Sequence, residues 1–491
     1  MEQLKIWYLV SEVTPFAKTG GLGDVGSSFT KSLKNKNLEI RLMMPKYKII
    51  NERKYILREV IRLKDIPVTL GGVTIPMNAK SAFLPDSKVQ IYFVEMPDFF
   101  GRIGLYGDAN TGEDYPDNAE RFAYFCRGCL ETLKILSWCP DIIHCNDWQT
   151  ALIPVYLKTL YKDDEFFKNI KTVFTIHNLA YQGIFNKEKA GNLGLNQEMV
   201  NSEGPLELNG NINLMKGAIH FSDWITTVSP NYANEILTKK ELGFGLQNDL
   251  RKFKDKFSGI LNGVDYSVWS PEIDKFIPFK YSKEDLTGKL KDKQALLNRV
   301  NLQYSEKTPV IGMISRIVEQ KGYGLLAESM DELLSLDFQL IILGSGDKNL
   351  ENQLDAFQKK YPDRISVNPT FDETFAHMIE AGSDFFLMPS SFEPCGMNQM
   401  YSLRYGTVPI VFKVGGLLDT INEINPEEGT GNGIVFDKYK SKELVKAIKR
   451  ALKHYKKKEE FEKNIIRLME EDFSWDESSD QYLDIYNKIL G

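Results

Sequence analysis

Short apolar runs alternate with amphipathic helical segments from one end of the 491-residue chain to the other. The runs are rich in β-branched and aromatic residues, and several are almost continuously hydrophobic, which is typical of parallel strands covered on both faces. The runs that we interpret as strands are 6–10, 91–94, 141–145, 172–176, 224–228, 310–315, 339–343, 385–388, 409–412 and 434–436. This alternation predicts an α/β fold made of doubly wound parallel sheets.

The alternation breaks between residues 258 and 298, where glycines, prolines and charged residues follow one another. We interpret this stretch as a linker, because a new strand-and-helix series begins near Pro309 and a chain of this length is expected to form two or three domains. The prediction is therefore two Rossmann-like domains that face a central cleft. They are residues 1–258 and 259–472, followed by a helix in 473–491 that packs back on the first domain.

Charge and composition limit the partners that the chain is expected to have. With 61 basic and 67 acidic residues the net charge is −6, so no general polyanion-binding surface, and no nucleic-acid partner, is expected. No apolar run approaches the length of a membrane span, and the N-terminus does not resemble a signal peptide. The odd number of cysteines, five, fits a reducing compartment. We expect a cytoplasmic protein without a membrane partner, and its oligomeric state is left open.

Four cysteines fall within twenty residues and raise the question of a zinc site. They are Cys126, Cys129, Cys139 and Cys145, with His144 beside the last. The first two lie on an expected helix, while the adjacent histidine and cysteine point to opposite faces of an expected strand. Buried thiols are therefore favoured over a metal site, and no metal is expected.

A glycine-rich run follows the first predicted strand directly and leads into an expected helix from Ser27 to Leu33. Lys18 stands at its edge, Gly20 and Gly21 lack a Cβ atom, and Asp24 follows. A lysine beside open N–H groups at a helix start is suited to phosphate. The alternative is that the glycines only turn the chain.

Two cations occupy a comparable place in the second half. Arg316 ends a predicted strand and Lys321 opens the next helix, so both lie where α/β domains bind ligands. They could equally be a surface pair that caps acidic neighbours. Gly344, after the following strand, could flank a nucleotide, although the full dinucleotide fingerprint is missing.

Glu393 follows the strand predicted at 385–388 and precedes a proline at an expected first helical position. It could merely satisfy the helix dipole. Alternatively, it could bind sugar hydroxyls while the N–H groups of the next residues hold other oxygens; these residues are Cys395, Gly396, Met397 and Asn398.

In the first half, His177 stands at the carboxyl end of the strand predicted at 172–176, and Asn178 follows it. Asp147 and Trp148 follow the strand predicted at 141–145 in the same way. A carboxylate next to an aromatic ring can hold a sugar, while the alternative for both the histidine and the tryptophan is ordinary core packing.

Six motifs occur together, in the order of a known family. They are the runs 18–25, 114–122, 175–178, 261–265, 315–316 with 320–322, and 393–396. From about Ile6 to Trp475 the chain resembles bacterial glycogen synthases and plant starch synthases, which are retaining glucosyltransferases of the GT-B architecture. The resemblance implies transfer of glucose from ADP-glucose to the non-reducing end of an α-1,4-glucan, with retention of configuration and without a metal or other cofactor.

The resemblance also implies roles at the reacting centre. Lys18, Arg316 and Lys321 would neutralise the diphosphate leaving group, and His177 would support the donor sugar. Tyr401 stands eight residues after the glutamate, where some related retaining transferases carry a second glutamate; the synthases as a group show this difference, so it supports the resemblance.

Further roles implied by the resemblance concern the sugar and the base. Asp147 and Asn178 would contact sugar hydroxyls, while Glu393 and the N–H groups of 395–397 would hold the glucose. Asn262 would stand at the interdomain wall, and Phe371 would stack on the base. The segment around the aspartate lacks the histidines that many bacterial members carry, and residue 398 is asparagine where threonine is common.

Other functions are compatible with the same residues. One is a GT-B transferase that uses UDP-glucose or another acceptor, such as a sucrose- or trehalose-forming enzyme. From a different class, a non-catalytic glucan-binding or priming scaffold is possible, although a decayed enzyme would be expected to lose some of these residues. A phosphorylase is not favoured, because the chain is too short.

Overall fold

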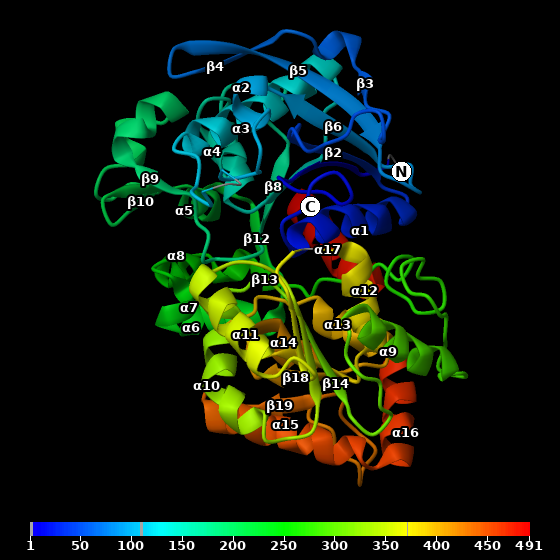
Figure 1. The fold of residues 1–491 in the computed structure, drawn as a ribbon. Coiled ribbons are helices and arrows are strands. Elements are labelled where there is room, and N and C mark those ends of the chain that lie inside the picture. Colours follow the sequence, from blue (N-terminus) through cyan, green and yellow to red (C-terminus); the bar gives the residue numbers. More distant parts are fainter. Residues whose placement is uncertain (1–2, 109–110, 371) are drawn as a thin grey trace. The chain divides into compact units, whose positions relative to one another are not determined.

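The computed structural model describes residues 3–108, 111–370 and 372–491. They form two compact units (Figure 1). The first contains the chain up to Gly263 together with Trp475–Gly491, and the second contains Val264–Ser474. The chain therefore passes from one unit to the other after Gly263 and returns before Trp475.

The first unit is built on a large sheet in the order β13-β12-β8-β7-β1-β2-β6-β5-β3, with β4 paired to β5. The strands from β13 to β6 are parallel, and β5, β4 and β3 extend the sheet in antiparallel fashion. The bounds are β1 (Lys5–Leu9), β2 (Glu39–Pro45), β3 (Arg58–Glu59), β4 (Ile66–Leu70), β5 (Val73–Phe83), β6 (Gln90–Glu95), β7 (Ile142–Asn146), β8 (Lys171–Ile176), β12 (Trp224–Thr227) and β13 (Phe257–Gly259).

Helices and a small antiparallel sheet complete this unit. The small sheet consists of β9 (Ile184–Asn186), β10 (Glu207–Leu208) and β11 (Asn211–Asn213). The helices are α1 (Gly21–Asn35), α2 (Pro97–Phe100), α3 (Asn118–Leu136), α4 (Leu152–Lys158), α5 (Leu214–Phe221), α6 (Pro230–Thr238), α7 (Lys240–Gly243), α8 (Gln247–Lys252) and α17 (Trp475–Leu490).

The second unit has a fully parallel sheet in the order β16-β15-β14-β17-β18-β19. Its strands are β14 (Val310–Ile314), β15 (Gln339–Leu343), β16 (Ile365–Asn368), β17 (Phe385–Met388), β18 (Val408–Phe412) and β19 (Ile434–Phe436). Its helices are α9 (Thr287–Arg299), α10 (Tyr323–Leu333), α11 (Lys348–Lys360), α12 (Glu373–Gly382), α13 (Asn398–Arg404), α14 (Gly415–Thr420), α15 (Ser441–Tyr455) and α16 (Lys458–Met469). This is the strand order of a Rossmann fold.

Helix α17 packs on α1 within the first unit; Figure 1 shows the two helices side by side in red and blue. Trp475 Nε1 donates a hydrogen bond to Ser28 Oγ (2.7 Å), and the hydroxyl of Tyr486 lies 2.6 Å from Nδ1 of His144 at the centre of the sheet. The helix thus contributes to the core of the unit in which the chain begins.

The stretch from 258 to 298 is not the linker that the sequence suggested. It contains α9, which packs against α12, and the side chains of Lys289, Asp292 and Lys293 are buried. The passage between the units is instead short, at Gly263 and Val264. A helix that buries charged side chains has no clear apolar stripe, which is why its sequence looks like a connection.

No helix among the described residues is both long enough and apolar enough to cross a membrane.

Candidate active site

Both sheets reverse their strand order at one place, and the predicted site residues lie there. In the first unit β2 and β7 flank β1, and in the second β15 and β17 flank β14. Loops at the carboxyl ends of strands on either side of such a switch point form the ligand site of open α/β sheets. The loops after β1 and β7 carry Lys18 and Asp147, and the loops after β14 and β17 carry Arg316 and Glu393.

The glycine-rich loop after β1 starts a helix earlier than its sequence suggests. Helix α1 begins at Gly21, so Asp24 lies in its first turn, and Gly20 precedes it in an extended conformation. Nζ of Lys18 lies 2.6 Å from Oδ2 of Asp24, whose other oxygen accepts a hydrogen bond from Thr14 Oγ1 at 3.0 Å. The loop therefore holds its own lysine against its own carboxylate.

A buried carboxylate that the sequence analysis missed organises this loop. Glu12, only 3% exposed, accepts hydrogen bonds from the N–H groups of Thr19 and Gly20, from Thr19 Oγ1 (2.6 Å) and from the hydroxyl of Tyr106 (2.7 Å). Two of the N–H groups expected to be open to a ligand are therefore bonded within the protein. The only signal in the sequence is an acidic residue three positions after the end of an apolar strand.

His177 is a neutral group held in a defined orientation at the end of β8. Burial lowers the pKa of its imidazole to about 3. Its Nε2 lies 2.8 Å from Oδ1 of Asn146, while the amide nitrogen of Asn146 donates to the carbonyl of Leu9 (2.9 Å). Because the oxygen of that amide faces the imidazole, Nε2 carries the proton and Nδ1 is left as an acceptor. Asn146 is the second residue that the sequence analysis did not assign to the site.

Asp147 sits beside this imidazole in a strained backbone conformation, with φ of 56°. One carboxyl oxygen accepts the backbone N–H of His177 at 2.7 Å. Burial raises the pKa of this carboxyl group to about 7, and the charge of Glu12 acts in the same direction. A left-handed aspartate at a strand end is a common mark of a functional site.

The remaining residues singled out in this unit have structural contacts. The side-chain oxygen of Asn178 accepts the backbone N–H of Ala180 at 3.0 Å and so shapes the loop. Trp148 packs edge-on against Phe122, as a core residue does. Asn262 is buried in the loop after β13, next to the passage between the units.

In the second unit the structure brings Lys321 and Glu393 together. Nζ of Lys321 lies 2.6 Å from Oε2 of Glu393, and the same oxygen accepts a hydrogen bond from Ser390 Oγ at 3.0 Å. Arg316 stands exposed just beyond the end of β14. A lysine, an arginine and a buried carboxylate thus gather on adjacent loops of one sheet.

Close backbone packing explains the glycines of this site. Gly344 has φ of 150°, and a Cβ atom there would lie 1.8 Å from the carbonyl oxygen of Ser315. Gly415 has φ of 49°, and its Cβ would lie 1.8 Å from the carbonyl oxygen of Glu393. Any side chain at either position would displace the loops that carry the cations and the carboxylate.

The loop from Glu393 to Asn398 turns into α13. Cys395 is buried, and Gly396 has φ of 71°, which favours glycine. Met397 is partly buried just before the helix. The amide of Asn398, the first residue of α13, donates to Oε1 of Glu380 at 3.2 Å. Phe371, predicted to stack on the base, lies outside the described residues.

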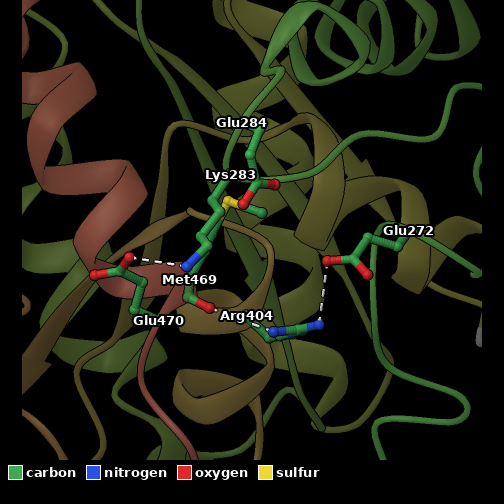
Figure 2. Close-up of a pocket in the computed structure, with 6 residues that line it drawn as sticks. All are labelled: Glu272, Lys283, Glu284, Arg404, Met469 and Glu470. Atoms are coloured by element: carbon green, nitrogen blue, oxygen red, sulfur yellow. Dashed lines mark hydrogen bonds and ion pairs between the residues drawn. The ribbon is translucent and has the colours of Figure 1, made fainter.

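A cavity of about 270 Å³ in this unit, apart from these site residues, lies at the far end of α13 (Figure 2). Its cations are paired with carboxylates of the same cavity: Lys283 Nζ lies 2.9 Å from Glu470, and Arg404 Nη2 lies 3.4 Å from Glu272. These ion pairs therefore hold the end of α13 in place, and they compensate the positive charge that an anion would otherwise meet in this cavity.

Three of the four cysteines near His144 lie in the core, whereas Cys139 is exposed, so the expectation of a buried thiol is wrong there. Burial raises the pKa of the Cys126, Cys129 and Cys145 thiols, which keeps them protonated. Within 3–108, 111–370 and 372–491, no group of three or more His, Cys, Asp or Glu side chains is arranged to hold a metal ion.

Comparison with known proteins decides the family. The family model for the starch synthase catalytic domain matches residues 5–252, and that for group 1 glycosyl transferases matches 297–468. A glycogen synthase of Chlorobaculum parvum is 42% identical over 488 residues, and one of Thermosipho africanus is 43% identical over 492, with 99% of each chain covered. The chain belongs to the glycogen synthase family.

Structural comparison agrees with membership of the glycogen synthase family. The catalytic domain of starch synthase IV from Arabidopsis thaliana, bound to ADP and acarbose, superposes with a TM-score of 0.92 at 33% identity, covering all of both chains. A sucrose-phosphate synthase from Thermosynechococcus elongatus, at 16% identity and a TM-score of 0.61, shares the fold. The resemblance inferred from the six motifs is confirmed, and so is the GT-B fold class.

As a member of the glycogen synthase family, the chain is a glycosyltransferase of the glycogen and starch synthase type. The structure adds three residues to those that the motifs pointed to. Glu12, Asn146 and Glu380 are buried, and each holds a predicted site residue or its loop through hydrogen bonds.

Proposed function

We propose that the chain transfers glucose from ADP-glucose to the non-reducing end of an α-1,4-glucan with retention of configuration. The observation that carries the proposal is the presence of cations and a carboxylate at the two switch points, in a chain that superposes on a starch synthase bound to ADP and acarbose. ADP corresponds to the product of the proposed donor, and acarbose is an oligosaccharide analogue.

In this proposal Lys18, Arg316 and Lys321 bind one diphosphate. The bond from C1 of glucose to the diphosphate oxygen breaks, which leaves positive charge on the sugar and negative charge on the departing group. Fixed cations stabilise that negative charge, which is the kind of interaction that accelerates a reaction most. Because the protein supplies them, we expect no metal requirement, and activity should persist in EDTA.

The acceptor hydroxyl then bonds to C1 on the face from which the diphosphate leaves, and its proton passes to a phosphate oxygen of the leaving group. This same-face route through an ion pair retains the configuration. We place Glu393 against hydroxyls of the glucose, together with the N–H groups of 395–397. The neutral His177 and its neighbour Asp147 orient the sugar at the reacting centre, with Asn178 nearby.

The remaining predicted residues have supporting places in this proposal. Gly20, Gly21 and Asp24 shape the loop that presents Lys18, and Gly344 brings the ends of β14 and β15 together. Asn262, buried in the loop after β13, helps to shape the donor site.

Radiolabelled ADP-glucose and UDP-glucose, each incubated with glycogen, test the proposal directly. Incorporation into glycogen from ADP-glucose is the expected result. Preferential incorporation from UDP-glucose would overturn the choice of base, and binding of glycogen without incorporation from either donor would favour a non-catalytic scaffold.

A further inference from the structure

Helix α13 links two distant anchoring points in the second unit. It begins at Asn398, directly after the loop proposed to hold the glucose, and it ends at Arg404. At that far end the guanidinium donates to Ser270 Oγ (3.0 Å) and to the carbonyl of Met469 (3.3 Å), as part of the cavity in Figure 2. The end of the helix away from the site is therefore held firmly.

The beginning of α13 is held by two buried side chains, Gln399, whose amide donates to the carbonyls of Cys395 and Gly396, and Glu380. Glu380 of α12 is 0% exposed, and each of its oxygens has one hydrogen-bond partner: Oε1 accepts from the amide of Asn398 (3.2 Å), and Oε2 lies 2.6 Å from the hydroxyl of Ser402, which can accept the carboxyl proton when Glu380 is neutral. The two partners are four residues apart and so lie on one face of the helix. Glu380 thus ties the first turn of α13 to α12.

The surroundings of Glu380 do not supply a directly bonded cation. The charged or titratable groups that face it are Lys289 from α9, Tyr281 from the preceding segment and Tyr405 from the end of α13. The ammonium group of Lys289 donates to four other oxygens instead, which belong to Ala381, Ser383, Tyr405 and Thr407. Burial raises the pKa of Glu380 to about 8, so the carboxyl group is mostly protonated at neutral pH.

We propose that Glu380 is a positioning residue for the nucleotide-glucose donor, which acts through Asn398 and Ser402 on the loop 393–397. The proposal rests on the proposed function, because it takes that loop as the donor site. A neutral carboxyl group can hold Asn398 without placing negative charge behind the loop. Its ionised form would add such a charge next to an anionic substrate, so the donor should bind less tightly above pH 8.

Three variants test this role. Glu380→Leu removes both hydrogen bonds, Glu380→Gln keeps an uncharged group of the same shape that can bond to both partners, and Glu373→Gln is a matched control on the exposed start of the same helix. The measurements are kcat and the KM for ADP-glucose from pH 6.5 to 9.5, with circular dichroism to check folding.

For Glu380→Leu we expect the donor KM to rise about tenfold at pH 7, as loss of roughly two hydrogen bonds predicts, with a smaller change in kcat. In the wild type the donor KM should rise above pH 8, by up to about tenfold per pH unit. Glu380→Gln should keep the wild-type KM for ADP-glucose at pH 7, and this KM should no longer rise above pH 8. Glu373→Gln should behave as the wild type.

A wild-type donor KM in Glu380→Leu, or an unchanged alkaline rise in Glu380→Gln, would overturn the positioning role. If Glu380→Leu does not fold, the pH profile of Glu380→Gln alone decides. A wild-type chain that transfers glucose from neither nucleotide-glucose would contradict the proposed function itself, so the two failures are distinguishable.

Discussion

The two switch points use similar residues in different electrostatic settings. In each, a lysine lies 2.6 Å from a carboxylate, but Lys18 and Asp24 are 32% and 17% exposed, whereas Lys321 and Glu393 are 20% and 7% exposed. A pair near water is screened and easily exchanged for another partner, while a buried pair interacts strongly and keeps its geometry. We infer that the second unit provides most of the preorganised charge.

The groups on the other site loops of the two units differ as well. In the first unit, burial drives two of them toward neutrality, with a pKa of about 3 for His177 and about 7 for Asp147. In the second unit, the loop after β14 carries an exposed arginine, Arg316. The comparison suggests that the first unit mainly orients the sugar and that the second mainly stabilises the leaving group.

The largest effect should follow from removing charge in the second unit. We expect Lys321→Ala or Arg316→Ala to lower kcat by about 10²–10³, the usual effect of deleting one such stabilising group. Lys321→Ala also leaves Glu393 without its cation. Steady-state transfer from ADP-glucose to glycogen measures this, and near-normal turnover in both variants would refute the role assigned to the second unit.

Removal of the neutral group in the first unit should affect transfer more than binding. For His177→Ala we expect kcat to fall about 10²-fold, because a misplaced sugar loses its reactive alignment. The Kd for ADP, measured by calorimetry, should change much less. Equal losses in transfer and in ADP binding would indicate a folding defect and would break the distinction between the units.

Lys18 provides the sharpest test of the comparison. Because its ion pair is the more exposed of the two, Lys18→Ala should lower kcat by only about tenfold, which corresponds to about 1.4 kcal/mol. The same assay applies, with Lys31→Ala, elsewhere in α1, as a control for loss of a lysine from the same helix. A loss as large as that of Lys321→Ala would show that the two lysines act equally on the diphosphate.

The last prediction concerns the free energy of unfolding rather than activity, and its pH dependence has opposite signs in the two units. Burial lowers the pKa of His144 to about 3. The contribution of this histidine to the free energy of unfolding is therefore complete above pH 6.5 and falls as the pH falls from 6.5 toward 3. Burial raises the pKa of Glu380 to about 8, so its contribution to the free energy of unfolding is lost as the pH rises from about 4.5 toward 8.

Urea unfolding at pH 6.5 and pH 5 checks this prediction for the histidine. The stability difference between the wild type and His144→Gln should shrink by about 2 kcal/mol over that interval, at about 1.4 kcal/mol per pH unit. The stability difference between the wild type and Glu380→Gln should instead grow as the pH falls from 6.5 to 5. Parallel pH profiles for both variants would contradict the burial of these groups as the cause.

The elements that could be predicted were those whose local pattern is unambiguous. The run 339–343 is apolar in all but its first residue and is β15 with the same bounds, while 475–490 has helical spacing and is α17. Strand β2 was missed because Glu39 and Arg41 interrupt its apolar residues, and α9 was missed because it buries charged side chains. Both depend on partners that are distant in the sequence.

The site follows the same rule. Residues directly at strand ends, such as Lys18 and Glu393, could be found because a strand, a turn and a helix start are local features. The sequence alone could not point to Glu12, Asn146 and Glu380, because each acts on the site through a hydrogen bond that only the folded structure shows. For Glu380 that bond joins side chains eighteen positions apart in sequence, on two different helices.

The place of α17 in the first unit has a consequence for synthesis of the chain. A ribosome delivers residues 3–263 long before it delivers the helix that supplies Tyr486 to the buried His144. During translation of Val264–Ser474, the first unit therefore lacks α17, and the face of α1 that α17 later covers stays exposed. The second unit, being one continuous segment, can fold as it leaves the ribosome, so the part of the chain made first is completed last.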